Sequence, residues 1–410
     1  MLSLEFIKNH PQDVKKNLQK RGVQVNIEQI LVLDKKRRGL ISATEKLQSQ
    51  RNQVSKENID PLERAKGKKL KGEIKENLDQ LKEIETSLNK ILLRLPNILQ
   101  KEVPSGEKGS IVKTIGTKTQ FDFAHKSYLD LNKNLDLIDI PRAAKIAGAR
   151  FVYLKREAVL LEFALIHFVL DIVLPKNFVP ILPPAMIKPS IMEALGYGDL
   201  AGQDTYLLEK DHLNLIGTAE QSIGAMYQNE ILDGKTLPQR FIGFSTSFRR
   251  EAGSYGRDVK GIMREHQFDK LEMFSFCHPS LSSQEHELFV SLEEELMQKL
   301  KLPYQIVRLG SKDLCAASSM TFDIETWIPS ENKYRETHSC SNCTDYQARG
   351  LNIRYRSPGQ KPDFVHTVNG TAFAMGRILI AILENYQQKD GSVKVPMALQ
   401  PYLNFKEIKR

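Results

Sequence analysis

The stretch "FRREAGSYGRDVKGIMREHQFDKLEMF", residues 248–274, combines many charges with glycines and regularly placed aromatic residues. A solvated charge run does not need the aromatic residues, and a core strand does not tolerate the three consecutive charges at 249–251. We interpret the stretch as a β-hairpin whose two strands are joined by a flexible, basic loop. Its glycines, Gly253 and Gly256, allow the bend, and its positive charge comes from Arg257, Lys260 and Arg264.

Alternate residues of a strand face the same side of a sheet. The first strand is therefore expected to present Arg249 and Glu251 together, and the second strand Phe268, Lys270 and Glu272. Such a face suits a nucleotide with an attached acyl group. An arginine binds phosphate and carboxylate through paired hydrogen bonds, a ring stacks on a purine, and a carboxylate accepts an ammonium or hydroxyl group. An exposed, salt-bridged hairpin would explain the charges but not the aromatic residues.

The composition of the 410-residue chain is that of a soluble globular protein with two or three domains, since 41% of its residues are hydrophobic and 27% charged. It has no run of eighteen apolar residues, so no membrane span is expected. Its first residues lack a basic segment followed by a long apolar one, so no secretory signal is expected either. Four cysteines fit a reducing compartment, and we expect a cytoplasmic location.

Two of the cysteines, Cys340 and Cys343, have the C-x-x-C spacing of a zinc half-site. A closed zinc site needs four ligands, and the sequence offers no second C-x-x-C or H-x-x-x-H pair. We therefore expect no structural zinc.

The first hundred residues carry most of the positive charge. Residues 1–102 hold 22 lysines and arginines against 14 acidic residues, a net +8 out of +9 for the chain. The same segment contains apolar residues spaced by seven, which predicts helices with a narrow apolar seam. One row is Leu33, Leu40, Leu47 and Val54; the others are Ile74, Leu81, Leu88 and Leu95, and Leu70, Ile84 and Ile91 with Asn77 in the gap.

The two seamed helices are expected to pack antiparallel, because only a short polar link joins them. Asp60-Pro61 is a helix start, and Leu95-Pro96-Asn97 ends the second helix. For about thirty residues per helix the hairpin would be about 45 Å long. Its basic faces remain outside, which suits binding along a nucleic-acid backbone; a dimerisation or spacer arm is the alternative.

Beyond a turn-rich linker at 102–111, the chain predicts mixed strands and helices. We expect a buried helix at 163–174, a strand with a proline break at 178–187, and further helices and strands. The helices are at 291–302 and 376–387, and the strands at 240–251, 266–276 and 320–329. Neither a Rossmann fingerprint nor a P-loop is present.

The hairpin resembles motif 2 of class II aminoacyl-tRNA synthetases, in the form found in the seryl-tRNA synthetase family. Other segments resemble that family's motifs in the right order. They are FVPILPP in motif 1, with Pro184 at the dimer-interface position, Thr218-Ala219-Glu220 in the serine pocket, RETHSCSN (335–342) in the ATP and magnesium segment, and VNGTAFAMGRILIAILENYQ (368–387) in motif 3. The resemblance covers essentially the whole chain, including the two-helix arm.

The resemblance implies an α+β fold in two domains. An N-terminal tRNA-binding domain with an antiparallel coiled-coil arm would occupy residues 1–108. A class II catalytic domain, built on an antiparallel β-sheet flanked by helices, would occupy 109–410. Its motifs 1, 2 and 3 would lie at about 165–187, 240–276 and 366–388, with a homodimer formed through motif 1.

The implied enzyme is an ATP-dependent ligase of the AMP-forming kind. It activates L-serine to seryl-adenylate, releases pyrophosphate, and transfers serine to the 3′ end of tRNA(Ser), or also of tRNA(Sec). Such chemistry needs charge neutralisation and alignment rather than a protein nucleophile. No DNA or membrane partner is expected.

The resemblance also assigns residues to roles. Arg249, Glu251 and Arg377 are the expected catalytic residues: Arg249 binds the α-phosphate and the serine carboxylate, Glu251 accepts the adenine amino group, and Arg377 pairs with the γ-phosphate. Phe268 stacks on adenine, and Glu336 and Ser339 hold Mg²⁺. The serine amino group is expected at Thr218, Ala219 and Glu220, and its hydroxyl at Glu272 and Thr371. Arg250, Thr337 and His338 complete the expected ATP-binding set.

Three positions depart from the family pattern. Arg250 stands where many relatives have a small residue, and Asn177 replaces the glycine that usually opens motif 1. His338 stands where the family usually has serine. An imidazole beside phosphates would make activity pH-sensitive, so His338→Ser would keep activity and flatten its pH profile near neutrality.

Three alternatives remain. The first is a related ligase that loads an amino acid onto a carrier protein. The second is a non-catalytic RNA-binding paralogue. The third is an enzyme for another small amino acid, such as threonine or alanine. The basic arm argues against the first, and the complete set of charged site residues against the second.

Overall fold

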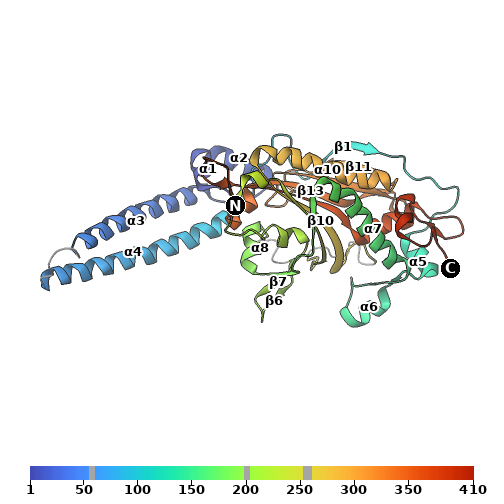
Figure 1. The fold of residues 1–410 in the computed structure, drawn as a ribbon, viewed down its shortest axis with the longest axis horizontal. Coiled ribbons are helices and arrows are strands. Elements are labelled where there is room, and N and C mark those ends of the chain that lie inside the picture. Colours follow the sequence, from blue (N-terminus) through green and yellow to red (C-terminus); the bar gives the residue numbers. More distant parts are fainter. Residues whose placement is uncertain (55–60, 198–203, 253–260) are drawn as a thin grey trace. The chain divides into compact units, whose positions relative to one another are not determined.

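The computed structural model describes residues 1–54, 61–197, 204–252 and 261–410 (Figure 1). Gly253, Gly256, Arg257 and Lys260 of the expected hairpin loop lie outside these residues. The chain divides into two compact units, Leu2–Pro96, and Asn97–Arg410 together with Met1. This division falls earlier than the expected boundary at residue 108, because Asn97 bonds within the larger unit. Its Nδ2 donates to the carbonyl oxygens of Ala317 and Cys343 at 2.9 and 2.8 Å.

The smaller unit is built around two long antiparallel helices, α3 (Ile27–Val54) and α4 (Pro61–Leu93), after the short α1 (Leu4–Asn9) and α2 (Pro11–Arg21) (Figure 1). The predicted seam is confirmed: Leu70, Ile74 and Leu88 are buried, and most residues between the seam positions are exposed. Helices of 28 and 33 residues agree with the expected length of about 45 Å. As predicted, α4 begins at Pro61 and ends before Leu95-Pro96.

The larger unit contains an eight-stranded sheet in its described part, in the order β1-β11-β12-β13-β16-β10-β9-β4. The strands are β1 (Ser110–Ile115), β11 (Tyr304–Arg308), β12 (Met320–Ile328), β13 (Lys333–Thr344), β16 (His366–Ala374), β10 (Gln267–Cys277), β9 (Gln239–Phe248) and β4 (Phe178–Ile181). All neighbours are antiparallel except β4 and β9. The predicted strands at 240–251, 266–276 and 320–329 are confirmed as β9, β10 and β12, although β9 ends at Phe248.

Two groups of helices cover the sheet. On one face, α7 (Glu157–Val173), α10 (Ser282–Lys299) and α12 (Met375–Asn385) bury the main core, to which β10 contributes Leu271 and Met273. On the other face, α8 (Pro189–Leu195), α9 (Ala219–Ile223) and α11 (Tyr346–Leu351) pack around Phe274 and Phe276. Because side chains alternate along β10, Lys270 and Glu272 lie on this second face. The candidate site around Lys270 and Glu272 therefore lies on the face of the sheet that α8, α9 and α11 cover.

The remaining elements are short. They are α5 (Tyr128–Leu135), α6 (Ile140–Ala147), β2 (Ile138–Asp139), β3 (Tyr153–Leu154), β5 (Met186–Ile187), β6 (Leu207–Leu208), β7 (Leu213–Leu215), β8 (Ile231–Asp233), β14 (Arg354–Arg356), β15 (Asp363–Phe364), β17 (Val393–Lys394), β18 (Glu407–Ile408) and several 3-10 turns.

Helix α7 corrects one expectation, because the helix predicted at 163–174 is buried on one side only. Leu161, Leu165 and Phe168 are buried in the core, whereas Phe163 is 58% exposed and Leu174 40% exposed. With the following turn, Glu157–Lys176 has a mean hydropathy of 2.1 and is long and apolar enough to cross a membrane. Its packing against α10, α12 and the C-terminal turn is that of a core helix, so its composition alone is weak evidence for a span.

The predicted strand and proline break at 178–187 are confirmed as β4, a non-strand segment and β5. Asn177, just before β4, has φ 63° and ψ 34°. Glycine adopts this left-handed conformation most easily, and asparagine is among the few other residues that tolerate it. The departure at Asn177 therefore preserves the local backbone.

Candidate active site

The motif 2 hairpin pairs β9 with β10, placing Phe268 opposite Ser247. One backbone bond continues beyond the strand, from Arg249 N–H to the carbonyl of His266 at 3.0 Å. Glu251 has φ 52°, which is not a strand conformation. The expectation that Arg249 and Glu251 share a strand face is therefore wrong, because the hairpin opens after Phe248.

Arg249 nevertheless faces the expected aromatic ring. Its guanidinium carbon lies 5.4 Å from the centre of the Phe268 ring, within cation–π range. Its Nε donates to the carbonyl of Gly217 at 3.3 Å. Because Gly217 precedes Thr218, this bond ties the motif 2 arginine to the segment that begins the serine pocket.

The neighbouring residues differ in exposure. The Glu251 carboxylate is 11% exposed, and its Oε2 accepts from Nη1 of Arg264 at 2.8 Å. An adenine amino group at Glu251 would share that carboxylate with Arg264. Arg250 is exposed, and its backbone N–H donates to the carbonyl of Asp204 at 2.8 Å.

The expected serine-binding residues converge on one buried cluster. Thr218 caps α9, and its Oγ1 lies 3.2 Å from Nζ of Lys270. Lys270 Nζ lies 2.5 Å from Oε2 of Glu272. The same oxygen accepts from the Thr371 hydroxyl at 3.4 Å, because Thr371 is paired with Glu272 across β10 and β16.

Glu220 completes this cluster from the first turn of α9. It is buried, and burial together with the charge of Glu272 raises the pKa of its carboxyl. Lys270 opposes that rise. Two carboxylates and one ammonium leave a net negative charge, which suits a ligand that carries its own ammonium group. The Cβ of Ala219 faces β9, since a Cβ added at Gly243 would lie 3.1 Å from it.

A second group of expected residues joins β13 to α12. Nη1 of Arg377 lies 3.0 Å from Oε1 of Glu336 and also 3.0 Å from its backbone carbonyl. Partial desolvation raises the pKa of Glu336, but Arg377 and Arg249 lower it by more, so it lies below its ordinary value. Arg377 is in the first turn of α12, as predicted, where backbone N–H groups favour anions.

The glycine before Arg377 is required by close packing. A Cβ on Gly376 would come within 2.7 Å of Oε2 of Glu265 and 2.5 Å of the carbonyl of Ile262. Any larger residue would push the start of α12, and with it Arg377, away from the sheet.

Ser339 lies opposite Asp323 on β12 and donates to its carboxylate. Asp323 is buried, and its Oδ1 has no partner among the described residues. Burial and the charge of Glu336 raise the pKa of Asp323. Within the described part of the chain, no three His, Cys, Asp or Glu side chains are grouped to hold a metal ion. The oxygen donors at Glu336 and Ser339 fit Mg²⁺ only if phosphate and water oxygens supply the remaining ligands.

Thr337 and His338 require a correction, because their side chains lie in the interior rather than facing ATP. The Thr337 hydroxyl lies 2.7 Å from that of Thr326 and 2.8 Å from Nδ1 of His338. The His338 ring packs edge-on against Phe373 and is 1% exposed. Burial lowers its pKa to about 3, so the ring stays neutral at physiological pH. The expected pH sensitivity from His338 is therefore wrong.

The four cysteines are free thiols; Cys277, Cys340 and Cys343 are buried, and Cys315 is exposed. Cys340 and Cys343 have raised pKa values, because burial penalises the thiolate. Neither is therefore prepared to be a nucleophile.

Sequence reasoning missed three contributors to the cluster. The strand pattern predicts Lys270 on the correct face but assigns it no role; the signal for one is its spacing of two from Glu272. Tyr197 and Gln347 both hydrogen-bond Glu220, at 2.8 Å each. They come from distant segments, and nothing in their local sequence indicates this.

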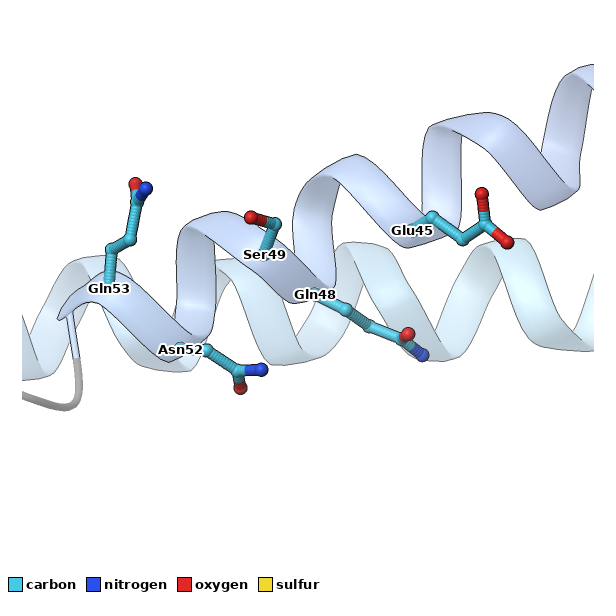
Figure 2. A pocket seen from close by; sticks show the side chains of 5 residues that line it. All are labelled: Glu45, Gln48, Ser49, Asn52 and Gln53. Atoms are coloured by element: carbon cyan, nitrogen blue, oxygen red, sulfur yellow. The ribbon is translucent and has the colours of Figure 1, made fainter.

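The arm presents a separate surface. Its exposed basic residues include Lys35, Lys36, Arg38, Lys46, Arg51, Lys66, Lys68, Lys69, Lys71, Lys75, Lys82 and Lys90. A shallow pocket on successive turns of α3 is lined by Glu45, Gln48, Ser49, Asn52 and Gln53 (Figure 2). These side chains are polar, but they carry one charge and include no catalytic grouping, so we place the chemistry at the sheet.

Two family models match the chain. Residues 1–99 match the seryl-tRNA synthetase N-terminal domain, and residues 206–386 match the tRNA synthetase class II core domain (G, H, P, S and T). The chain is 40% identical over 421 residues to the serine–tRNA ligase of Nitrosopumilus maritimus, covering 100% of both chains. It is 43% identical over 427 residues to that of Dictyoglomus thermophilum, covering 100% of this chain and 99% of the other.

Two solved structures match over the whole chain. The seryl-tRNA synthetase of Pyrococcus horikoshii complexed with ATP has a TM-score of 0.93 at 37% identity, with 100% and 99% of the two chains covered. The cytoplasmic serine–tRNA ligase of Naegleria fowleri in complex with AMP has a TM-score of 0.88 at 29% identity, with the same coverage. The α+β fold with its helical arm is thus confirmed.

Proposed function

The chain belongs to the seryl-tRNA synthetase family, and from this premise we propose how its residues divide the work of the reaction. It is an ATP-dependent serine–tRNA ligase of class II. It activates L-serine with ATP to seryl-adenylate and pyrophosphate, and then transfers serine to the 3′ end of tRNA(Ser). The observation that supports this best at the site is the buried cluster of Glu220, Lys270, Glu272 and Thr371, which offers partners for both an ammonium and a hydroxyl group.

Serine binding needs one group for each polar end of the substrate. We assign the α-ammonium to Glu220 with Thr218, and the hydroxyl to Glu272 with Thr371. The carboxylate goes to Arg249, which is tied to this cluster through Gly217. Serine satisfies Glu272 and Thr371 through its hydroxyl group. Alanine has no hydroxyl group and would leave these buried polar groups unpaired, which makes its binding less favourable.

ATP binding extends the site from Arg249 toward Arg377. Phe268 stacks on adenine, Glu251 accepts the adenine amino group, Arg249 contacts the α-phosphate and Arg377 the γ-phosphate. Placing cations at both ends of the triphosphate aligns the serine carboxylate with the α-phosphorus and stabilises the charge on departing pyrophosphate. The chain's own part is thus alignment and charge neutralisation.

A magnesium ion bound at Glu336 and Ser339 would screen the phosphate charge. This assignment rests on the oxygen donors at these two residues and on the unpartnered Oδ1 of the nearby Asp323. Arg377 keeps the Glu336 carboxylate ionised and in place until ATP arrives.

The basic arm is assigned to tRNA. Its exposed lysines and arginines lie along two helices whose apolar seam is used internally, so they remain available for phosphates. We expect recognition of the long variable arm of tRNA(Ser) by shape and backbone. tRNA(Sec) would be a second acceptor for the same reason.

A homodimer through motif 1 is supported by an exposed apolar surface. Leu160, Phe163 and Leu174 of α7 and its following turn are 45, 58 and 40% exposed, and Val179 and Leu182 nearby in the chain are 54 and 79% exposed. A surface with this much apolar side chain is typical of an interface. A cytoplasmic location fits the reduced cysteines.

The test is ATP–pyrophosphate exchange with serine, threonine, alanine or glycine, with magnesium and without tRNA. Exchange with serine alone is expected. Exchange with serine followed by failure to charge tRNA(Ser) would favour a carrier-protein acceptor, and no exchange with any of the four would favour a non-catalytic RNA-binding protein.

A further inference from the structure

The Glu220 carboxylate is held from two sides by neutral hydrogen-bond donors. The Tyr197 hydroxyl donates to Oε2 and the Gln347 amide Nε2 to Oε1, each at 2.8 Å. Tyr197 follows α8, and Gln347 is on α11, so two separate elements fix one carboxylate on α9. Glu220 is 6% exposed and Gln347 fully buried. Water therefore cannot easily replace either donor.

A third residue orients the amide. The Thr367 hydroxyl donates to Oε1 of Gln347 at 2.7 Å, and Thr367 is also fully buried. If the amide were turned over, its oxygen would face the oxygen of Glu220, which is unfavourable when the carboxylate is ionised. Thr367 and Glu220 thus both select the orientation in which Gln347 donates to Glu220.

The charges around Glu220 make these donors important. Burial and the negative charge of Glu272 raise the pKa of Glu220, whereas Tyr197, Gln347 and Lys270 lower it. Lys270 is already paired with Glu272. Among the described residues Cys343 also interacts electrostatically with Glu220, and burial raises the pKa of its thiol and so favours the neutral form. The two neutral donors therefore favour the ionised form of Glu220, against the effects of burial and of Glu272.

We propose that Tyr197 and Gln347 are positioning residues of the serine site, which hold Glu220 as an oriented carboxylate ready to accept the substrate's α-ammonium group. A carboxylate has about four acceptor sites, so each oxygen keeps one for the ammonium after bonding its donor. Neither residue needs to touch serine. The inference rests on the proposed role of Glu220 as the ammonium partner.

The experiment measures serine-dependent ATP–pyrophosphate exchange from pH 6 to 9 with the full chain. Tyr197→Phe is expected to raise the KM for serine by about ten- to a hundredfold, because the buried carboxylate loses one of its two neutral hydrogen-bond donors. The KM for ATP and kcat should change less than about twofold. Because a donor is lost, the pKa of Glu220 should rise, and the acidic limb of kcat/KM for serine should move to higher pH.

Three further variants make the outcome decisive. Gln347→Met should act in the same direction as Tyr197→Phe. Tyr355→Phe is the matched control: it removes a hydroxyl that lies 3.0 Å from Nε2 of His278, and should leave the serine KM unchanged. In a Glu220→Gln background, Tyr197→Phe should add little further loss, because the carboxylate it positions is gone.

The outcomes separate this inference from the role on which it rests. If Glu220→Gln leaves the serine KM unchanged, the assignment of Glu220 fails. If Glu220→Gln raises it but Tyr197→Phe does not, only the positioning inference is overturned. A Tyr197→Phe variant that raises the KM values of serine and ATP alike, with no shift of the acidic limb, would show a merely structural role.

Discussion

Nη1 of Arg377 lies 3.0 Å from Oε1 of Glu336, so an ion pair joins the start of α12 to β13. The two residues are far apart in sequence; we assign Arg377 to the γ-phosphate and Glu336 to Mg²⁺. The pair keeps Glu336 ionised and holds the guanidinium against the sheet before ATP binds. Each residue therefore has a second role as the partner of the other.

Arg377→Gln should lower kcat/KM for ATP in the exchange reaction by about 10²–10³-fold, the usual cost of losing one preorganised donor to a developing charge. The KM for serine should change little, because Arg377 lies at the other end of the site. Exchange kinetics with ATP and serine varied in turn provide the check. Arg356→Gln, which changes an exposed arginine of β14, is the control; an equal loss in both variants would contradict the assignment.

Shortening the arm should separate the two steps of the reaction. Deleting 28–98 would remove both arm helices, but Asn97 should be kept because its Nδ2 bonds to three oxygen atoms of the larger unit. Arg37 lies 3.9 Å from Glu85, so Ile41 and Leu81 are at similar heights on the antiparallel helices. Replacing 42–80 by a short glycine-containing turn preserves that pairing.

This shortened chain should retain serine-dependent exchange within about twofold and lose at least about 10²-fold in tRNA(Ser) charging, because most of the arm's exposed basic side chains are removed. Both activities are measured on the same preparation. Full charging activity in the shortened chain would refute the tRNA assignment of the arm.

Selection of serine over alanine should depend on the hydroxyl partners. Thr371→Val removes the hydroxyl that lies 3.4 Å from Glu272 and nearly preserves the side-chain volume. The preference for serine, measured as the ratio of kcat/KM values in exchange, should fall by about ten- to a hundredfold. Thr326→Val, at a buried threonine paired with Thr337, is the matched control and should leave this ratio unchanged.

The apolar face of α7 should be required for dimer formation. Phe163 is 58% exposed in the single chain, and Phe163→Asp would place a charge in the proposed interface. The mass measured by light scattering should fall to that of one chain at micromolar concentration. Leu78→Asp, on the exposed side of α4 in the arm, is the control and should leave the dimer intact. If Phe163→Asp also remains dimeric, the interface does not include this face of α7.

The fold was predictable where the sequence pattern is local. Sevenfold spacing identified α3 and α4, and Pro61 marked the start of α4. Alternation predicted β9 and β10, but not that β9 stops at Phe248 and that Glu251 adopts a positive φ. Such an opening depends on contacts with other segments, including the bond from Arg250 N–H to the Asp204 carbonyl, which no local pattern shows.

The site was less predictable, because burial depends on tertiary packing. Sequence order placed His338 beside the phosphates, yet its ring packs on Phe373 and its pKa falls to about 3. His338→Ser should therefore leave the pH profile near neutrality unchanged, contrary to the expectation from sequence. Tyr197 and Gln347 are the converse case: they contact Glu220 in the folded chain, but no local sequence pattern predicts that they belong to the site.

A partly buried carboxyl group on α7, Glu162, makes stability depend on pH. Burial and the neighbouring Asp269 raise the pKa of Glu162, on α7, to about 8. Glu162 and Asp269 in turn raise the pKa of Glu265, which burial already places well above its usual range. Glu162 and Glu265 therefore bind more protons in the folded chain than in the unfolded chain near neutral pH.

The sign of the effect follows from proton binding. In the unfolded chain Glu162 loses its proton near its ordinary pKa of 4.5, whereas in the folded chain it keeps it to about pH 8. Between these values the folded state binds more protons, so the free energy of unfolding falls as pH rises, by about 1.4 kcal/mol per pH unit for one such group. Above pH 8 both states are ionised and this contribution levels off.

Glu162→Gln should remove this dependence, because an amide does not titrate and can still donate to Asp269. The variant should gain stability relative to the parent as pH rises from 5.5 to 8, and the difference should stop growing above pH 8. Thermal unfolding measured at half-unit pH steps gives the comparison, and Glu193→Gln, at an exposed position on α8, is the control. Parallel curves for Glu162→Gln and the parent would mean that Glu162 is ionised in the folded chain, contrary to its burial beside Asp269.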